Sequence, residues 1–372
     1  MSTIDPHQFD EIRPYYDDEV SDVVARLLAT SELFSALAKF RFPRLSRWLP
    51  FIIEPLVKKA LHKQLSGVDT VAKMQDIVAG YMQKMIDRST SKLTFSGIER
   101  LDPKAAYLYI SNHRDIAMDP AFVNWGLYSN DIKTVRIAIG DNLLQKPYVS
   151  DLMRLNKSFI VNRSATGVRG KLKALMQLSS YIDHSISTGE SVWLAQREGR
   201  AKDGNDRTES AILKMLNMSL KKRGVAFNEL ARTLRIVPVS ISYEYDPCDA
   251  LKAAELQSLD SEGSYQKSQF EDIESIVRGI VGFKGDVHVA FGEPLTADFD
   301  DAEALAAAID RAVIGNYHLH PSNLLAAEQS VDQVPAAKRE GFQSRLAEVA
   351  AKDRPWFIAQ YANPVQSKNE FG

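Results

Sequence analysis

The sequence predicts an α/β fold with a mostly parallel central sheet flanked by helices, a helical N-terminal region and a helical C-terminal tail. From about residue 96, short apolar runs alternate with segments whose apolar residues recur at helical spacing. This alternation is typical of parallel βαβ units. Before that point the pattern is helical. The composition, with 45% apolar and 25% charged residues, is ordinary for a globular protein.

The predicted elements divide the chain into three parts. These are a helical N-terminal region (1–95), an α/β domain (96–325) and a helical C-terminal tail (326–372). Apolar runs predict buried strands at 105–112, 135–140, 158–162, 190–196, 235–243 and 286–292. Helices are expected between them at 121–128, 168–187 and 209–224. A site is expected in the loops at the carboxyl ends of the strands, as is usual for parallel sheets.

Charge and cysteine content exclude several functions. The net charge of −2 provides no overall positive field, so nucleic acid is not expected as a partner. The single cysteine, Cys248, can form neither an internal disulfide nor a paired-cysteine zinc site, and no histidine is near it in the sequence. The acidic, polar N-terminus does not resemble a signal peptide, and no apolar run reaches the roughly 18 residues of a spanning helix. We therefore expect a cytoplasmic protein.

Residues 33–63 form a candidate membrane-docking segment. This stretch contains seven Lys or Arg residues and one acid, Glu54, with bulky apolar residues between them. Basic and apolar residues mixed in this way suit helices in a membrane interface, with rings among acyl chains and cations near phosphates. Prolines 43, 50 and 55 interrupt any long amphipathic face, so a helix packed on the rest of the protein is the alternative. Docking predicts a peripheral protein on the inner face of a membrane.

Residues 111–120, SNHRDIAMDP, concentrate titratable groups in one short stretch. Near neutral pH an imidazole can accept a proton from a hydroxyl if its other nitrogen is held by an acceptor. Asp119 and Asp115 are the candidate acceptors for His113. A six-residue step does not return to one face of a helix, so we expect His113 on a loop. Asp119 is then expected as the N-cap of a helix, with Pro120 at its first position.

The same stretch contains the letters HRD, which occur in the catalytic loop of protein kinases. That loop requires an asparagine five residues after the aspartate, where this sequence has Pro120. A glycine-rich loop must also precede it, and only Gly67, Gly80 and Gly97 lie upstream. The kinase interpretation is therefore rejected.

Four motifs in order resemble those of the glycerolipid acyltransferase family, which includes glycerol-3-phosphate and lysophosphatidic acid acyltransferases. The first is a histidine followed by an aspartate, and the second an apolar strand ending in arginine. The third is a strand entering a Glu-Gly turn near basic residues, and the fourth a strand with a proline. Their counterparts here are His113 with Asp119, KSFIVNRS with Arg163, VWLAQREGR with Glu198, Gly199 and Arg200, and RIVPVSISYE with Pro238.

Two departures from the family pattern leave alternatives open. Five residues instead of four separate His113 from Asp119, so Asp115 remains a rival, although Asp119 keeps the helix start where the family has it. In the third motif Arg200 directly follows the glycine, so Arg197 and Arg207 are rivals for its role.

The resemblance implies a peripheral O-acyltransferase of phospholipid biosynthesis. The donor would be a fatty acyl thioester of coenzyme A or acyl carrier protein, and the acceptor a lysophosphatidic acid hydroxyl, with His113 as general base. Arg163, Arg200 and Arg207 would hold phosphate, Glu198 and Gly199 the glycerol. Pro238 points to a strand edge, a strand end or an acyl-chain groove. No cofactor or metal is expected, and the histidines at 318 and 320 are interpreted as solvent-facing. The alternatives are glycerol-3-phosphate acylation or an inactive lipid-binding protein.

Overall fold

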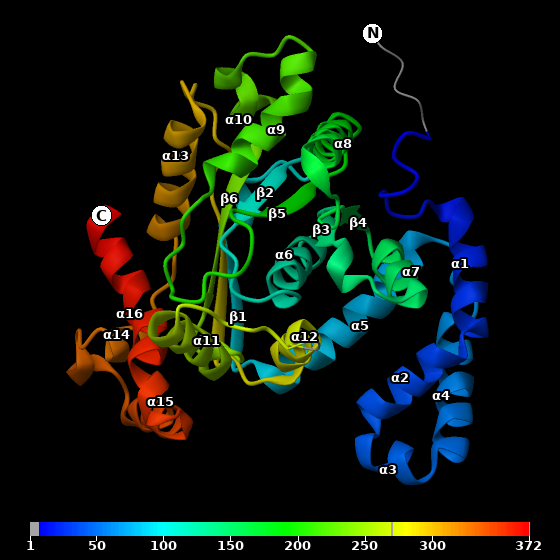
Figure 1. The fold of residues 1–372 in the computed structure, drawn as a ribbon, viewed down its shortest axis with the longest axis horizontal. Coiled ribbons are helices and arrows are strands. Elements are labelled where there is room, and N and C mark those ends of the chain that lie inside the picture. The colour runs from blue at the N-terminus through cyan, green and yellow to red at the C-terminus, as the bar shows by residue number, and fades with distance from the viewer. Residues whose placement is uncertain (1–6, 269–270, 372) are drawn as a thin grey trace. The chain divides into compact units, whose positions relative to one another are not determined.

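The computed structural model describes residues 7–268 and 271–371. The chain divides into a smaller compact unit, Met1–Met82 with Arg136–Ala174, and a larger one, Gln83–Val135 with Leu175–Gly372 (Figure 1). Two helices run from one unit into the other, α5 (Val71–Ser89) and α8 (Gly167–Ser187).

The larger unit contains five strands in the hydrogen-bonded order β1-β7-β6-β2-β5. Neighbouring strands are parallel except for β6 and β7, which are antiparallel. Strands β2 and β6 are buried along their whole length, which explains their continuous apolar sequences. The bounds are β1 (Lys92–Ser96), β2 (Leu108–Ser111), β5 (Val192–Ala195), β6 (Ile236–Tyr243) and β7 (Asp286–Phe291).

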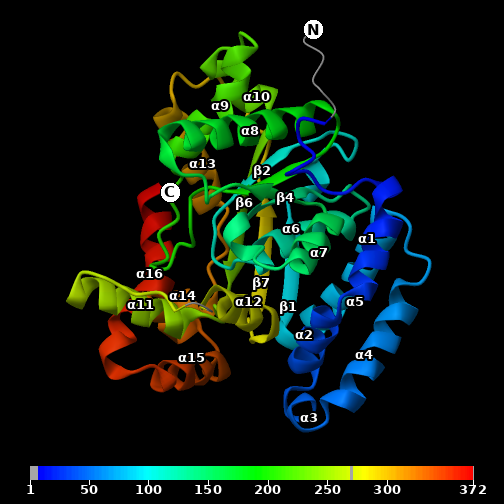
Figure 2. The ribbon, with the colours of Figure 1, turned by 45° about the vertical axis from the view of Figure 1, so that its right-hand side comes forward.

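Helices cover this sheet and pack on one another. Helix α13 contacts β6, α9 and α16, and α16 also contacts α11 and α14. The helices are α6 (Met118–Tyr128), α9 (Ser210–Lys222), α10 (Leu230–Thr233), α11 (Asp249–Glu262), α12 (Glu271–Val281), α13 (Ala302–Gly315), α14 (Pro321–Ala326), α15 (Ala336–Glu348) and α16 (Arg354–Phe371). The last three gather beside α11, orange to red in Figures 1 and 2. There Phe342, Phe357 and Tyr361 pack with ring centroids 5.2–5.9 Å apart.

The smaller unit is mainly helical. Its two strands, β3 (Arg136–Gly140) and β4 (Ser158–Val161), pair in parallel. Buried residues such as Val20, Leu27, Leu65 and Leu155 form its core. Its helices are α1 (Asp17–Ala29), α2 (Ser31–Arg41), α3 (Pro43–Trp48), α4 (Pro50–Leu65) and α7 (Pro147–Leu155). No helix in the described part of the chain is both long enough and apolar enough to span a membrane.

The predicted α/β fold class is confirmed, and each predicted strand contains an observed one. One strand differs from the expectation, because residues 92–96 form β1 although the region up to residue 95 is predicted to be helical. β1 pairs only with β7 in the larger unit, and its side chains are half-buried or exposed. A half-exposed strand lacks the continuous apolar run that identifies the buried ones.

Candidate active site

The candidate site is built on the loop that follows β2. Beyond the strand, the side chain of Asn112 replaces a backbone partner for β6. Its Nδ2 donates to the carbonyl of Ile241 at 2.9 Å, and its Oδ1 accepts from the Ile241 amide at 2.8 Å. The amide of Ala201, on the loop after β5, donates to the carbonyl of His113 at 2.8 Å. Two neighbouring elements therefore fix the backbone that carries His113.

His113 faces Asp119 across this loop. Nδ1 of His113 lies 2.9 Å from Oδ2 of Asp119, whose side chain is fully buried, while 14% of the His113 side chain is exposed. A carboxylate in this position accepts the Nδ1 proton and leaves the Nε2 lone pair available. The indole of Trp193 borders the imidazole edge-on, with ring centroids 5.9 Å apart. Nε2 is thus the ring nitrogen that a substrate can reach.

Three further donors surround the carboxylate of Asp119. The backbone amides of Arg114 and Asp115 donate to Oδ2 at 2.7 and 2.9 Å. The hydroxyl of Tyr243, at the end of β6, donates to Oδ1 at 2.6 Å. Burial, with the negative charge of Asp119, holds the pKa of Tyr243 well above its ordinary value, so the phenol keeps its proton. A buried charge is tolerable when it is hydrogen-bonded in this way.

Asp115 has a different role. Its Oδ1 accepts from the amides of Ala117 at 2.9 Å and Met118 at 2.8 Å, and so caps the first turn of α6. The prediction of Asp119 as N-cap and Pro120 as first helical residue is wrong, because α6 begins at Met118. Asp115, and not Asp119, therefore accepts from the amides at the start of α6. Burial, reinforced by the charge of Asp119, raises the pKa of Asp115 to about 6.

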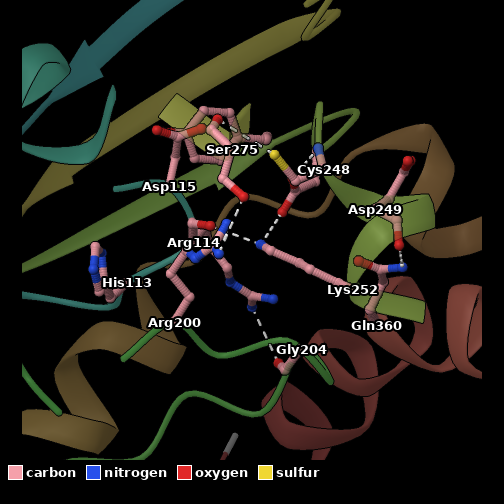
Figure 3. Close-up of polar contacts among 12 residues, drawn as sticks. His113, Arg114, Asp115, Arg200, Gly204, Cys248, Asp249, Lys252, Ser275 and Gln360 are labelled. Atoms are coloured by element: carbon pink, nitrogen blue, oxygen red, sulfur yellow. Dashed lines mark hydrogen bonds and ion pairs between the residues drawn. The ribbon is translucent and has the colours of Figure 1, made fainter. Parts of the chain in front are cut away.

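Charged side chains also hold the loop that carries His113, through contacts made by Arg114 (Figure 3). The guanidinium of Arg114 donates from Nη2 to Asp206 at 2.6 Å and to the carbonyl of Gly204 at 3.1 Å. Nζ of the buried Lys252, on α11, donates to the carbonyl of Arg114 at 2.6 Å and also contacts Asp246. Because these ions are paired with one another, the loop is held without an isolated buried charge.

The third-motif residues lie beside His113, because the amide of Ala201 bonds to the His113 carbonyl. Glu198 and Gly199 are exposed, and Gly199 has φ +76°, a conformation that favours glycine. Arg200 is half-buried, and its Nη2 lies 3.4 Å from Oγ of Ser275 on α12 (Figure 3). The loop that carries the Glu-Gly turn and Arg200 is therefore hydrogen-bonded to the loop that carries His113.

The rival arginines of the third motif have other partners. Nη2 of Arg207 lies 3.4 Å from Oε2 of Glu370, and its guanidinium covers the Phe371 ring at 4.9 Å. Both partners belong to α16. Nε of Arg197 lies 4.0 Å from a carboxylate oxygen of Glu209.

Arg163 belongs to the smaller unit, whereas His113 belongs to the larger one. It follows β4, as predicted, and its side chain is exposed. Its amide and that of Ser164 donate to the two carboxylate oxygens of Asp141, each at 3.1 Å. These bonds fix the backbone at the carboxyl end of β4.

Pro238 occupies an interior strand, so the predictions of an edge or a strand end are wrong. β6 lies between β2 and β7 and continues to Tyr243. The carbonyl of Pro238 accepts from the Gly292 amide at 2.8 Å, where the β6–β7 ladder ends. The nitrogen of Pro238 faces the same side as its carbonyl. The β6–β7 ladder has ended there, so the missing N–H of proline costs the sheet no hydrogen bond.

Two remaining residues have structural surroundings. His320 is buried instead of solvent-facing; its Nε2 lies 3.3 Å from Oγ of Ser242, and burial lowers its pKa to about 3. Cys248 is buried, and burial raises its pKa to about 12, which disfavours the reactive thiolate. In the part of the chain that the structure describes, no group of three His, Cys, Asp or Glu side chains is arranged to hold a metal ion.

The sequence did not single out the residues that support the dyad. Tyr243 had one available signal, since a tyrosine in a buried strand usually needs a partner for its hydroxyl. Arg114 stood inside the first motif, but its partner Asp206 lies 92 positions away. Lys252 comes from a helix 138 positions away.

Comparison with known proteins matches one part of the chain to a known domain family. Residues 92–242 match the model of the Acyltransferase family. They are an acyltransferase domain. The domain runs from β1 into β6 and contains the dyad of His113 and Asp119, and the chain is an acyltransferase. The predicted family resemblance is confirmed at this level.

Among solved structures, the 1-acyl-sn-glycerophosphate (LPA) acyltransferase PlsC of Thermotoga maritima is similar to this chain. The TM-score is 0.40 at 15% sequence identity, and the match covers 76% of this chain and 95% of that one. A similarity of this size does not determine the substrate. No curated protein matches the chain significantly.

Proposed function

We propose that the acyltransferase domain moves a fatty acyl group from an acyl thioester to the free hydroxyl of lysophosphatidic acid, in phospholipid biosynthesis. The observation that carries this proposal is the pairing of His113 with the buried carboxylate of Asp119. The geometry presents one imidazole nitrogen to a substrate and holds the other, as general-base catalysis requires. Glycerol-3-phosphate as acceptor is the alternative substrate.

The proposed reaction is direct transfer without an acyl-enzyme. Nε2 of His113 takes the proton of the acceptor hydroxyl as its oxygen attacks the thioester carbonyl. The new C–O bond gives a tetrahedral oxyanion, which collapses by breaking the C–S bond. The leaving thiolate takes the proton back from the imidazolium and departs as a thiol. Asp119 stabilises that imidazolium through its hydrogen bond to Nδ1.

For the acceptor we propose Glu198, Gly199 and Arg200 as the contact group, since their loop adjoins His113. A guanidinium binds phosphate through two parallel hydrogen bonds, and Arg200 is half-buried near the reacting centre. Arg207 is a weaker candidate because α16 engages it. Arg163 remains a candidate phosphate ligand. The proposed donor is acyl-CoA or the acyl thioester of acyl carrier protein.

We propose that α2, α3 and α4 dock on a membrane. Trp48 is 78% exposed and Phe51 70% exposed, and both stand among exposed cations. Such a surface suits acyl chains and anionic headgroups. The other exposed bulky apolar residues here are Phe40, Phe42, Leu45, Leu49, Ile52 and Leu56. The protein would then act as a peripheral protein on the inner face of a membrane.

A thiol-release assay with acyl-CoA tests the proposed reaction. The purified chain receives lysophosphatidic acid, glycerol-3-phosphate or no acceptor, and lipid products are separated by chromatography. We expect acceptor-dependent thiol release and phosphatidic acid with lysophosphatidic acid. Activity only with glycerol-3-phosphate would support the alternative substrate. If neither acyl-CoA nor acyl-loaded acyl carrier protein supports transfer, the remaining interpretation is an inactive lipid-binding protein.

Vesicle flotation tests docking. A Trp48→Ser, Phe51→Ser variant should bind vesicles of phosphatidylcholine and phosphatidylglycerol at least about tenfold more weakly than the wild type. The control, Leu259→Ser with Ile273→Ser, removes two exposed apolar side chains elsewhere and should float normally. Equal losses in both variants would contradict the proposed docking surface.

A further inference from the structure

One hydrogen bond to Asp119 differs in origin from the others. Three of its donors, His113 and the amides of Arg114 and Asp115, belong to the same loop as the dyad. The fourth, the hydroxyl of Tyr243, comes from β6. Tyr243 is therefore the side chain through which the sheet itself contacts the carboxylate.

The division of donors between the two oxygens makes this contact important. Oδ2 of Asp119 receives three donors, whereas Oδ1 receives the Tyr243 hydroxyl, and the carboxylate is fully buried. Without that hydroxyl, a charged oxygen would lie unsatisfied in the interior. The unsatisfied carboxylate would be stabilised by turning toward other donors. Such a rotation would displace Oδ2 of Asp119 from Nδ1 of His113.

The position of the phenol is itself fixed. The ring of Tyr243 packs against Phe122, on the helix that carries Asp119, with centroids 5.8 Å apart. The side chain is buried on a central strand. A hydroxyl held in this way fixes the plane of the carboxylate.

We propose that Tyr243 is a positioning residue for the reaction, acting through Asp119 to set the orientation of His113. The inference rests on the proposed function above, in which His113 is the general base. It extends the dyad to a chain of three side chains: Tyr243 donates to Asp119, and Asp119 accepts from His113.

The test is a double-mutant cycle with Tyr243→Phe and Asp119→Asn, measured as kcat and KM for acyl-CoA and lysophosphatidic acid. Tyr243→Phe removes one oxygen atom and should lower kcat about 10–100-fold, the usual effect of losing a hydrogen bond to a charged group. KM should change less than about twofold, because no substrate contact is lost. In the Asp119→Asn background the same change should have less than about a twofold effect, since the negative charge that the hydroxyl holds in place for His113 is no longer there.

Tyr109→Phe is the matched control. Tyr109 lies on the neighbouring strand β2, and its buried hydroxyl has no hydrogen-bond partner within the described chain. The control should keep wild-type kcat, and circular dichroism should show both phenylalanine variants folded.

Two results would overturn the proposal: a Tyr243→Phe kcat within twofold of the control, or an equal loss in the Asp119→Asn background. If His113→Ala retained activity, the proposed function would fail whatever Tyr243 does.

Discussion

The contrast between Asp119→Asn and Asp115→Asn distinguishes the two carboxylates that the sequence left as rivals. In Asp119→Asn the amide must keep its oxygen at the Oδ2 position, where three donors converge. Its NH₂ group then faces the Tyr243 oxygen, which can accept. The hydrogen-bond pattern survives, and the change removes the negative charge alone.

The size of the effect follows from the distance. Nδ1 and Oδ2 are 2.9 Å apart, so the charge centres of imidazolium and carboxylate lie about 4 Å apart. At an effective dielectric constant of about 20, this pair is worth about 4 kcal/mol. The proton is only partly transferred in the transition state, so we expect a loss of about 2–4 kcal/mol. Asp119→Asn should therefore lower kcat about 30–1,000-fold.

Asp115→Asn should lower kcat less than about threefold, because its amide oxygen can still cap α6 through the Ala117 and Met118 amides. Both variants are assayed by thiol release at saturating substrates, with thermal unfolding as a check on the fold. Equal losses in the two variants, or a larger loss in Asp115→Asn, would refute this assignment of the dyad.

Three further predictions concern stability and reactivity. His320 has a pKa of about 3 when folded against an ordinary value near 6.5, so the unfolded chain binds more protons between these values and stability falls with falling pH. Relative to His320→Asn, the wild type should lose about 2 kcal/mol of unfolding free energy between pH 7.5 and 5 in urea titrations; a constant difference would contradict this. Gly279→Ala should destabilise the fold by about 1–3 kcal/mol, because the new Cβ would come within 2.1 Å of Oδ2 of Asp115; unchanged stability would be inconsistent with that contact. Iodoacetamide should modify Cys248 at least about 100-fold more slowly in the folded protein than in urea, with mass spectrometry as readout, and fast native labelling would argue against its burial.

The sequence predicted those parts of the fold that carry continuous local patterns. β2 and β6 are buried on both faces, so their apolar runs stand out. β1 could not be recognised in the same way, because a half-exposed strand of five residues has no such run. Pro238 misled the prediction, since the cost of its missing N–H depends on where the β7 ladder ends.

Site residues that are close to one another in the sequence could be predicted, whereas those far apart in the sequence could not. His113 and Asp119 lie six positions apart, and the motif named Asp119 and Asp115 as the two candidate partners of His113. That Asp115 caps α6 in place of Asp119 could not be foreseen, because either aspartate can accept from backbone amides and no local pattern distinguishes them. Tyr243 lies 124 positions from its partner Asp119, and no local pattern reports a contact at that separation.

The most direct test of the central claim is the acyl transfer rate of His113→Ala with acyl-CoA and lysophosphatidic acid. Removing a general base that is held by a buried carboxylate should lower kcat at least about 100-fold, while the variant unfolds at a temperature close to that of the wild type. A folded His113→Ala variant with kcat within threefold of the wild type would contradict the account.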